Sequence, residues 1–179
     1  MNLFLLSTIR SSTCYTYLSA SLSIALRMGL HRAIITDQDV ISLEISKRLF
    51  WALRLLVNDL AACCGMPRLL SDEEVDQELP KEVNDIYIGG RRISMQPSSE
   101  ICYMSGANAY NQLHFIRDKV TRQIYPVKGL GAQTSDPMAY TVNLETVHQI
   151  ERELNQWVNS SIPWGYRLGT YYEESGLTE

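Results

Sequence analysis

Small and apolar residues in the first part of the chain recur at three- and four-residue spacing, which lines one face of an α-helix. The residues on this face are Leu18, Leu22, Ala25, Leu26 and Gly29. Gly29 ends the helix because glycine readily adopts the left-handed conformation, and Leu30 is expected to fold back onto the last turn near Ala25. Residues 2–28 are therefore predicted to form one long helix, or two short helices divided near residues 11–13.

A second, longer helix is predicted over residues 41–64. Three residues before it are alternative N-caps: Thr36, Asp37 and Asp39. Its apolar face holds for about four turns and is expected to point into the core; the face consists of Ile45, Leu49, Leu53, Leu56 and Leu60. Gly65 closes the helix and Pro67 prevents its continuation. Residues 71–74 then read Ser-Asp-Glu-Glu, a capping box that predicts a new helix start.

Two further helices are predicted in the second half of the chain. The third runs from residue 98 or 99 to residue 125, and Pro126 ends it. Its inward face is Ile101, Met104, Leu113, Ile116, Val120 and Ile124, and its outward face is Arg117, Asp118, Lys119 and Arg122. The fourth starts after Thr141 or Asn143 and ends at residues 160–164. Its apolar face is Leu144, Val147, Ile150, Leu154, Trp157 and Val158.

No segment shows the period-two alternation of a β-strand, so the predicted fold class is all-α. The number and length of the helices indicate a multi-helix bundle or an irregular helical array. Apolar residues at the start of the chain run without a cap into the first helix. The sequence therefore looks like an incomplete part of a larger helical domain.

Three motifs on this helical framework resemble the fungal-specific transcription factor domain, also described as the middle homology or xylanolytic activator regulatory domain of fungal zinc binuclear cluster factors. The motifs lie at residues 29–32, 44–51 and 65–80, and a weaker fourth block lies at residues 154–163. The matching positions are Gly29, Leu30, His31, Arg32, Glu44, Arg48, Phe50, Trp51, Gly65, Pro67, Asp72, Asp76, Leu79 and Pro80. They carry over as structural positions, and the resemblance defines no catalytic, cofactor-binding or metal-binding residue.

The resemblance implies a regulatory domain of a nuclear fungal transcription factor that controls RNA polymerase II transcription of metabolic genes. It implies that DNA binding and zinc belong to an N-terminal zinc cluster that this sequence lacks, so no cofactor is expected in this chain. The candidate partners are coregulator proteins, a small-molecule inducer and a second copy of the chain, and no membrane contact is expected.

Residues 1–164 are expected to form this regulatory domain, truncated at its N-terminal side, and residues 165–179 to form a tail. Two positions depart from the family pattern: Val57 stands where an acidic residue is usual, and Met66 where arginine is common. Charge pairs of the second helix are therefore not carried over. The alternative hypothesis is a helical protein-interaction or small-ligand-sensing module unrelated to transcription.

Composition is that of a soluble globular domain: 179 residues, 45% hydrophobic and 20% charged. A formal net charge of −4 argues against this segment gripping nucleic acid by bulk electrostatics. The apolar residues 1–6 are too short for a membrane span. The four cysteines, Cys14, Cys63, Cys64 and Cys102, lack the paired spacing of a zinc site, so reduced and buried thiols are expected.

Candidate chemistry is sparse, and no enzyme is predicted. The sequence has three histidines, but it has no nucleophile elbow, no paired-histidine motif and no nucleotide loop. No set of catalytic residues is therefore recognisable. His31 is better explained as a helix-end cation or a buried hydrogen-bonding group than as a ligand. The five acids in residues 72–78 favour helix-start charges over a metal site, because no calcium-loop glycine accompanies them.

Three other groups of polar or aromatic residues have an ordinary structural explanation. Glu44 with residues 47–48 is either a partner-binding edge or a set of helix ion pairs, and the spacing favours the second. Phe50 and Trp51 are expected in the core rather than in a ligand cage. Residues 89–92 read Gly-Gly-Arg-Arg and predict a turn with an exposed basic pair.

Overall fold

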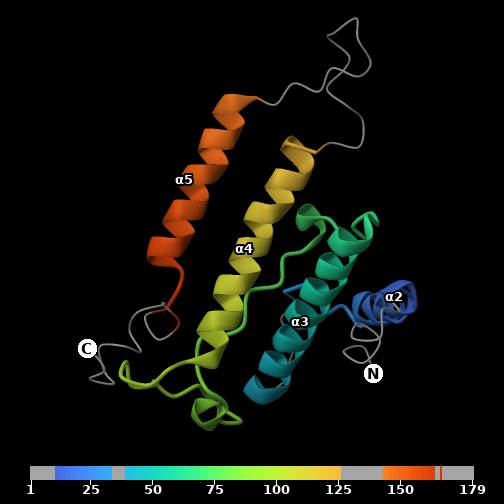
Figure 1. The fold of residues 1–179 in the computed structure, drawn as a ribbon. Helices are drawn as coiled ribbons and strands as arrows, with labels where there is room; N and C mark the ends of the chain where they lie inside the picture. Colours follow the sequence, from blue (N-terminus) through green and yellow to red (C-terminus); the bar gives the residue numbers. More distant parts are fainter. Residues whose placement is uncertain (1–10, 34–38, 126–142, 164–165, 167–179) are drawn as a thin grey trace, which may run out of the picture. The chain divides into compact units, whose positions relative to one another are not determined.

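The computed structural model describes residues 11–33, 39–125, 143–163 and 166. Its elements, in chain order, are α2 (Ser11–Arg27), α3 (Val40–Cys64), the short 3₁₀ helices η1 (Asp72–Glu74) and η2 (Asp85–Tyr87), α4 (Tyr103–Gln123) and α5 (Leu144–Ser160) (Figure 1). The described residues contain no β-strand, only an isolated bridge between Ile88 and Ile93. The predicted all-α class is therefore confirmed.

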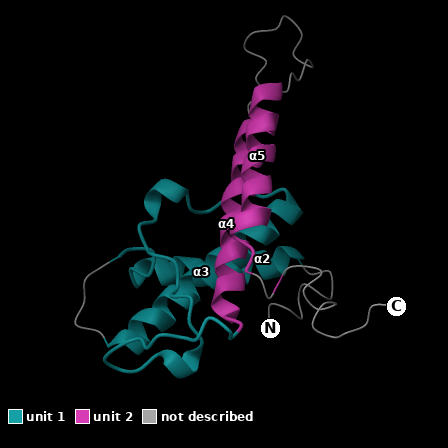
Figure 2. Cartoon of the chain, turned by 90° about the vertical axis from the view of Figure 1, so that its left-hand side faces the viewer, with its two compact units in different colours: residues 1–100 teal, residues 101–179 magenta. Residues whose placement is uncertain are grey.

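The chain divides into two compact units, residues 1–100 and residues 101–179 (Figure 2). In the first unit α2 packs against α3, and in the second α4 packs against α5. The predicted boundary between a domain and a tail at residue 164 falls beside residues outside the described part of the chain, so it stays a prediction. None of the described helices is long and apolar enough to cross a membrane.

Glycines end both helices of the first unit, as predicted. Gly29 has φ 75° and the amide of Leu30 donates to the carbonyl of Ala25 at 3.1 Å. Gly65 has φ 64° and the amide of Met66 donates to the carbonyl of Ala61 at 2.8 Å. Both pairs form the Schellman arrangement, in which the residue after the glycine closes the last turn.

Local caps begin two of the helices. Among the three predicted N-caps of α3, Asp39 fills the position: its carboxylate accepts from the Ser42 amide at 2.7 Å, and the hydrogen bonds from Ser42 lower the pKa of Asp39. Thr36 and Asp37 lie outside the described residues. Asn143 caps α5 by accepting from the amide of Glu145 at 2.9 Å, which confirms one of its two predicted caps.

The capping box of residues 71–74 forms, and the Glu74 carboxylate accepts from the Ser71 amide at 2.8 Å. It starts only the single turn of η1, so the helix expected there is much shorter than predicted. The chain then continues as an irregular segment whose hydrogen bonds go to other parts of the unit.

The buried face of α3 is the main correction to the sequence analysis. Ile45 and Leu49 are 58% and 53% exposed, Leu53 and Leu56 are half-buried, and of the predicted leucine face only Leu60 is buried. The buried residues are Glu44, Lys47, Phe50, Trp51, Arg54, Val57, Asn58, Leu60 and Ala61. This face is buried because the segment after α3 supplies partners for its charged side chains. On α2, by contrast, the predicted Leu18, Leu22 and Ala25 are all buried.

The second unit is a pair of helices whose faces are only partly as predicted. Helix α4 begins at Tyr103, later than expected. Of the six positions predicted to face inward, Ile101 precedes the helix and is exposed, and the other five are half-buried. Asp118, predicted to face outward, is 3% exposed. On α5, Ile150 is buried, whereas Leu144, Leu154 and Val158 are exposed. The predicted burial of the cysteines holds for Cys14 and is wrong for Cys63, which is exposed.

Candidate functional site

Residues 68–85, here called the return segment, run back along α3 and are fixed to its charged side chains. Asp72 pairs with Arg54, and Glu78 accepts from Lys47 at 2.7 Å. Farther along, the amide of Lys81 donates to Oε1 of Glu44 at 2.6 Å. Residue numbers rise along the segment as they fall along the helix, so the two run antiparallel.

Tryptophan 51 joins the return segment to α3 through its ring and its indole nitrogen. Trp51 Nε1 donates to the backbone carbonyl of Glu78 at 2.8 Å, and the guanidinium of Arg54 lies 5.1 Å from the ring centroid. Trp51 is 6% exposed and Phe50 is fully buried, which confirms both as core aromatics. The burial of Arg54 is therefore compensated by a carboxylate and an aromatic face together.

The return segment is also fixed to the turn between α2 and α3. Arg32 Nε donates to both carboxylate oxygens of Asp76 at 3.1 Å, and the amide of Ala33 donates to the same carboxylate at 2.8 Å. Gln77 Nε2 donates to the carbonyls of Leu30 and Arg32 at 3.1 Å. The hydrogen bond from Ala33, followed by the charge of Arg32, holds the pKa of Asp76 below its ordinary value.

His31 contributes to this junction through its backbone. Its carbonyl accepts from the amides of Asp76 and Gln77 at 3.3 and 3.1 Å. Nδ1 of its ring has no hydrogen-bond partner among the described residues. The structural role foreseen for His31 is thus carried by its main chain, and the role of the imidazole stays a prediction.

Three of the acids of residues 72–78 lie at the start of η1, as predicted, and three of the five acids pair with cations elsewhere in the unit. Asp72 binds Arg54 and Arg68, Asp76 binds Arg32, and Glu78 binds Lys47. The hydrogen bond from Lys47 is the largest cause of the lowered pKa of Glu78. Among the described residues, no group of three or more His, Cys, Asp or Glu side chains could hold a metal ion.

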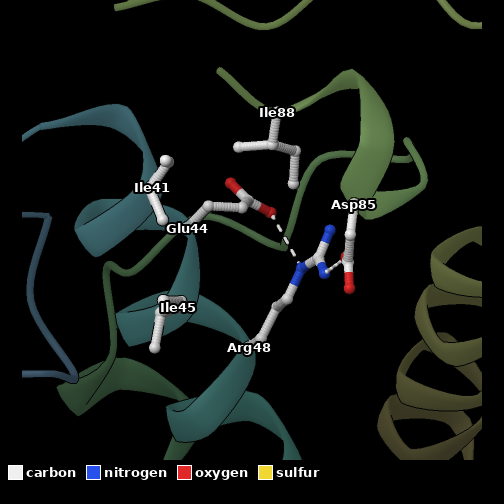
Figure 3. Close-up of a pocket in the computed structure, with 6 residues that line it drawn as sticks. All are labelled: Ile41, Glu44, Ile45, Arg48, Asp85 and Ile88. Atoms are coloured by element: carbon white, nitrogen blue, oxygen red, sulfur yellow. Dashed lines mark hydrogen bonds and ion pairs between the residues drawn. The ribbon is translucent and has the colours of Figure 1, made fainter. Parts of the chain in front are cut away.

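A pocket of about 300 Å³ opens between the first two turns of α3 and the chain around η2. Six residues line it: Ile41, Glu44, Ile45, Arg48, Asp85 and Ile88. Figure 3 shows the polar side chains Glu44, Arg48 and Asp85 pointing toward one another, with Ile41 and Ile45 on α3 and Ile88 on the opposite side. The pocket therefore combines apolar walls with one cluster of three charges.

The charges of the cluster are paired within the protein. Arg48 Nε lies 3.6 Å from Glu44 Oε1, Nη1 binds Asp85, and Nη2 donates to the carbonyl of Val83 at 3.1 Å. One guanidinium and two carboxylates give the lining a formal charge of −1. Such a pocket disfavours an anion and suits an apolar molecule that is neutral or cationic.

The pocket lining has no cysteine, serine or histidine, and its two carboxylates, Glu44 and Asp85, are both paired with Arg48. The chain belongs to the fungal specific transcription factor domain family, which it matches over residues 1–159.

Curated fungal proteins extend this match. The chain is 31% identical over 163 residues to "Activator of stress genes 1" of Saccharomyces cerevisiae. This alignment covers 88% of this chain and 16% of that protein. The chain is 26% identical over 202 residues to "Activator of stress genes protein 1" of Candida albicans, and this alignment covers 96% of this chain and 20% of that protein. It is 30% identical over 142 residues to "Transcriptional activator protein acu-15" of Neurospora crassa, and this alignment covers 79% of this chain and 14% of that protein.

The chain thus spans a fifth or less of the length of these three relatives. No solved structure matches it.

The structure brings most of the predicted motif positions into one assembly. Six of them supply side-chain contacts between α3, the return segment and the α2–α3 turn: Arg32, Glu44, Arg48, Trp51, Asp72 and Asp76. Gly29, Leu30 and Gly65 close helices, and the carbonyl of Pro67 accepts from the Tyr15 hydroxyl at 3.1 Å. Pro80 is buried and Leu79 is half-buried.

Sequence reasoning missed Lys47 and Arg54 as partners of the return segment, and Gln77 as a contact of that segment with the α2–α3 turn. Their side chains are buried, although polar residues on a helix ordinarily face solvent. The available signal was the position of Lys47 and Arg54 on either side of Trp51, at three- and four-residue spacing on one helical face.

Proposed function

We propose that this chain is a regulatory domain that controls the activity of a longer fungal transcription regulator. The carrying observation is that the family's motif residues converge on one structural joint, where ion pairs and hydrogen bonds hold the return segment to α3. A joint made of polar contacts can exist in two arrangements of similar free energy, which is what a regulatory element requires. The names of the fungal relatives, which include activators, support the same role.

On this proposal, a zinc cluster elsewhere in the protein supplies specific DNA binding, and the regulator acts in the nucleus on RNA polymerase II genes of metabolism. The net charge of −4 supports the assignment of DNA binding to another part of the protein, because DNA-binding modules are typically basic. The family consists of transcription factor domains, so the hypothesis of a module unrelated to transcription is dropped. Lack of catalytic activity remains a prediction.

Among the candidate partners, the pocket favours a small inducer over a protein surface. Its volume of about 300 Å³ is near the lower end for a small-molecule site. A ligand seated between Ile45 of α3 and Ile88 would stabilise the arrangement in which η2 lies against the helix. The ligand would shift activity only by binding this arrangement more tightly than an arrangement in which η2 has moved away from the helix.

The regulatory role can be tested in a yeast reporter strain. The 179-residue chain is inserted between a heterologous DNA-binding domain and an activation domain, and reporter output is compared with the fusion that lacks it. We expect the chain to lower output several-fold, and Trp51→Ala to release the restraint by loosening the joint. Tyr17→Ala, an exposed aromatic of the same unit, is the matched control and should behave as wild type. Equal output with and without the chain contradicts the proposal.

The pocket can be tested in the same fusion with two substitutions on one helix face. Ile45→Asp places a charge in the pocket wall, whereas Leu49→Asp changes a residue of similar exposure, one turn away, that does not line the pocket. We expect only Ile45→Asp to change the response to culture conditions that alter reporter output. The same response in both variants argues against ligand control through this pocket and leaves the restraint itself intact.

A further inference from the structure

The hairpin after η2 carries an exposed basic sequence, Arg-Arg-Ile-Ser-Met, at residues 91–95. The Gly89 amide donates to the carbonyl of Arg92 at 3.0 Å, and the Ser94 amide donates to the carbonyl of Tyr87 at 2.8 Å. Together with the bridge between Ile88 and Ile93, these two bonds define the hairpin. The predicted turn is therefore present, and its second arm presents the basic pair and a serine.

These side chains have no role in holding the fold. Arg91, Arg92 and Ser94 are exposed, and Met95 is 92% exposed. No ion pair joins Arg91 or Arg92 to another described residue, and the Ser94 hydroxyl makes no hydrogen bond to one. In contrast, Arg32, Arg48, Arg54 and Arg68 of the same unit all pair with carboxylates. The basic pair of the hairpin is thus available to another molecule.

We propose that Ser94 is a phosphorylation site for a serine/threonine protein kinase of the basophilic class. Such an enzyme recognises its substrate through carboxylates that bind guanidinium groups shortly before the acceptor, here Arg91 and Arg92 at the third and second positions before Ser94. Met95 follows the acceptor and offers an apolar contact. Charge, exposure and spacing together provide the recognition.

The reaction is an ordinary phosphoryl transfer from ATP. Ser94 Oγ attacks the γ-phosphorus, the new O–P bond forms, and the bond from that phosphorus to the oxygen bridging it to the β-phosphate breaks. ADP leaves, and the hydroxyl proton passes to the catalytic aspartate of the kinase. Two backbone hydrogen bonds hold the acceptor arm in the hairpin, from the amides of Gly89 and Ser94, and these two bonds must break for the arm to become extended.

Another serine of the same unit shows why a preceding arginine alone is not sufficient. Ser71 has Arg68 three positions before it, but Arg68 is bound to Asp72 and the Ser71 hydroxyl donates to Glu73. Three acids follow it, which carboxylates of a basophilic kinase repel. Ser98 is exposed but has Met95 and Gln96 at the corresponding positions. Ser94 alone among these three serines has the required neighbours.

A phosphate on Ser94 changes the electrostatics beside the pocket. Its charge of about −2 would offset the two arginines and draw their side chains toward it. Ile93, the preceding residue, is bridged to Ile88 of the pocket wall, and the carbonyl of Gly90 accepts from the amide of Val40, the first residue of α3, at 3.4 Å. Phosphorylation therefore acts on the structure that joins the pocket wall to α3. The modification itself is independent of the proposed role in transcription.

The test uses the purified 179-residue chain, radiolabelled ATP and the catalytic subunit of a cyclic-nucleotide-dependent kinase as the basophilic probe. We expect stoichiometric labelling at Ser94, identified by mass spectrometry. Ser94→Ala should abolish that label, and the double variant Arg91→Ala with Arg92→Ala should lower kcat/KM by at least about tenfold. Ser98→Ala is the matched control and should be labelled as wild type.

Circular dichroism checks that each variant keeps the wild-type helix content, which is expected because all the altered residues are exposed. Three results would overturn the proposal: no labelling of the wild-type chain, undiminished labelling of Ser94→Ala, or equal labelling rates with and without the arginine pair. None of them depends on a reporter response, so failure of the proposed regulatory function would be seen separately.

Discussion

Among the described residues, each unit has one tryptophan that donates its indole N–H to a backbone carbonyl, and the surroundings of the two differ. Trp51 donates to Glu78 at 2.8 Å and Trp157 donates to Ala109 at 2.7 Å. The first acceptor lies in the return segment and the second within helix α4. The same interaction therefore fixes an irregular segment in one unit and joins two regular helices in the other.

The ion pairs of the two units differ in the same way. In the Lys47–Glu78 pair the lysine side chain is 7% exposed, whereas in the Lys119–Glu153 pair it is 43% exposed. A buried cation depends on its partner because it cannot return to water without unfolding, whereas an exposed one can be solvated in place. The first unit is consequently the more sensitive to loss of single polar contacts.

The largest expected effect comes from removing the two tryptophans in turn. Trp51→Ala should destabilise its unit by about 3 to 5 kcal/mol, because it leaves a cavity and exposes the carbonyl of Glu78. Trp157→Ala should cost less than about 2 kcal/mol, because that ring is already partly in water. Denaturant titration measures the loss, and amide hydrogen exchange assigns it to α3 or to α5. Equal losses for the two variants would contradict the contrast between the units.

The helix ends of the first unit are predictable from sequence, because the information is local. A glycine that adopts positive φ, followed by an apolar residue that folds back, is sufficient at Gly29 and Gly65. The family resemblance likewise identifies Arg32 and Asp76, which pair across 44 positions in the sequence. No periodicity argument shows that pairing.

The buried face of α3 is not predictable from its own sequence. Periodicity favours the face of Ile45 and Leu49, but burial is decided by residues that pair with Lys47 and Arg54 from 31 and 18 positions away in the sequence. A charged face becomes the inward face only when each charge finds a partner, and partners from an irregular segment leave no periodic signal. The pocket was missed for the same reason, since Asp85, at the end of the return segment, and Ile88, just after it, complete a lining that begins on α3.

An intermediate effect is expected from neutralising the two glutamates. Glu78→Gln should cost about 1 to 2 kcal/mol, because Lys47 stays buried without a carboxylate, whereas Glu153→Gln should cost less than about 1 kcal/mol. Glutamine keeps the size of the side chain, so packing is held constant. Urea titrations at neutral pH give both values. A larger loss for Glu153→Gln would show that exposure of the lysine does not set the difference.

Acid provides an independent check on the Glu78 pair. The hydrogen bond from Lys47 lowers the pKa of Glu78 in the folded chain below its ordinary value. The stability that this carboxylate contributes is therefore complete above the unfolded pKa of about 4 and is lost as the pH falls through the folded pKa. Wild type and Glu78→Gln should differ in stability at pH 6, and the difference should shrink as the pH falls below about 4. A gap that does not shrink as the pH is lowered would assign the effect to something other than the charge.

The smallest effects come from two glycines that are needed for different reasons. Gly65 has φ 64°, and a Cβ there would meet no heavy atom within 4 Å. The cost of Gly65→Ala is therefore conformational, about 1 kcal/mol, and Gly65→Asn should cost less because asparagine tolerates the left-handed region. At Gly106 in α4, a Cβ would lie 2.9 Å from Cζ of Tyr166. The helix propensity gained by Gly106→Ala, up to about 1 kcal/mol, is opposed by displacement of that ring.

We expect the two terms at Gly106 to cancel to within about 0.5 kcal/mol, so stability alone would not reveal the contact. The Tyr166 phenol would, because burial, followed by the neighbouring Cys102 and Tyr103, raises its pKa, and a ring pushed into solvent loses the burial contribution. In Gly106→Ala the pKa of Tyr166 should therefore fall toward its ordinary value, measured by NMR of ring-labelled tyrosine, while Gly65→Ala leaves it unchanged. An unshifted Tyr166 in Gly106→Ala, with a stability gain near the full propensity term, would mean that the ring does not need the space that glycine leaves.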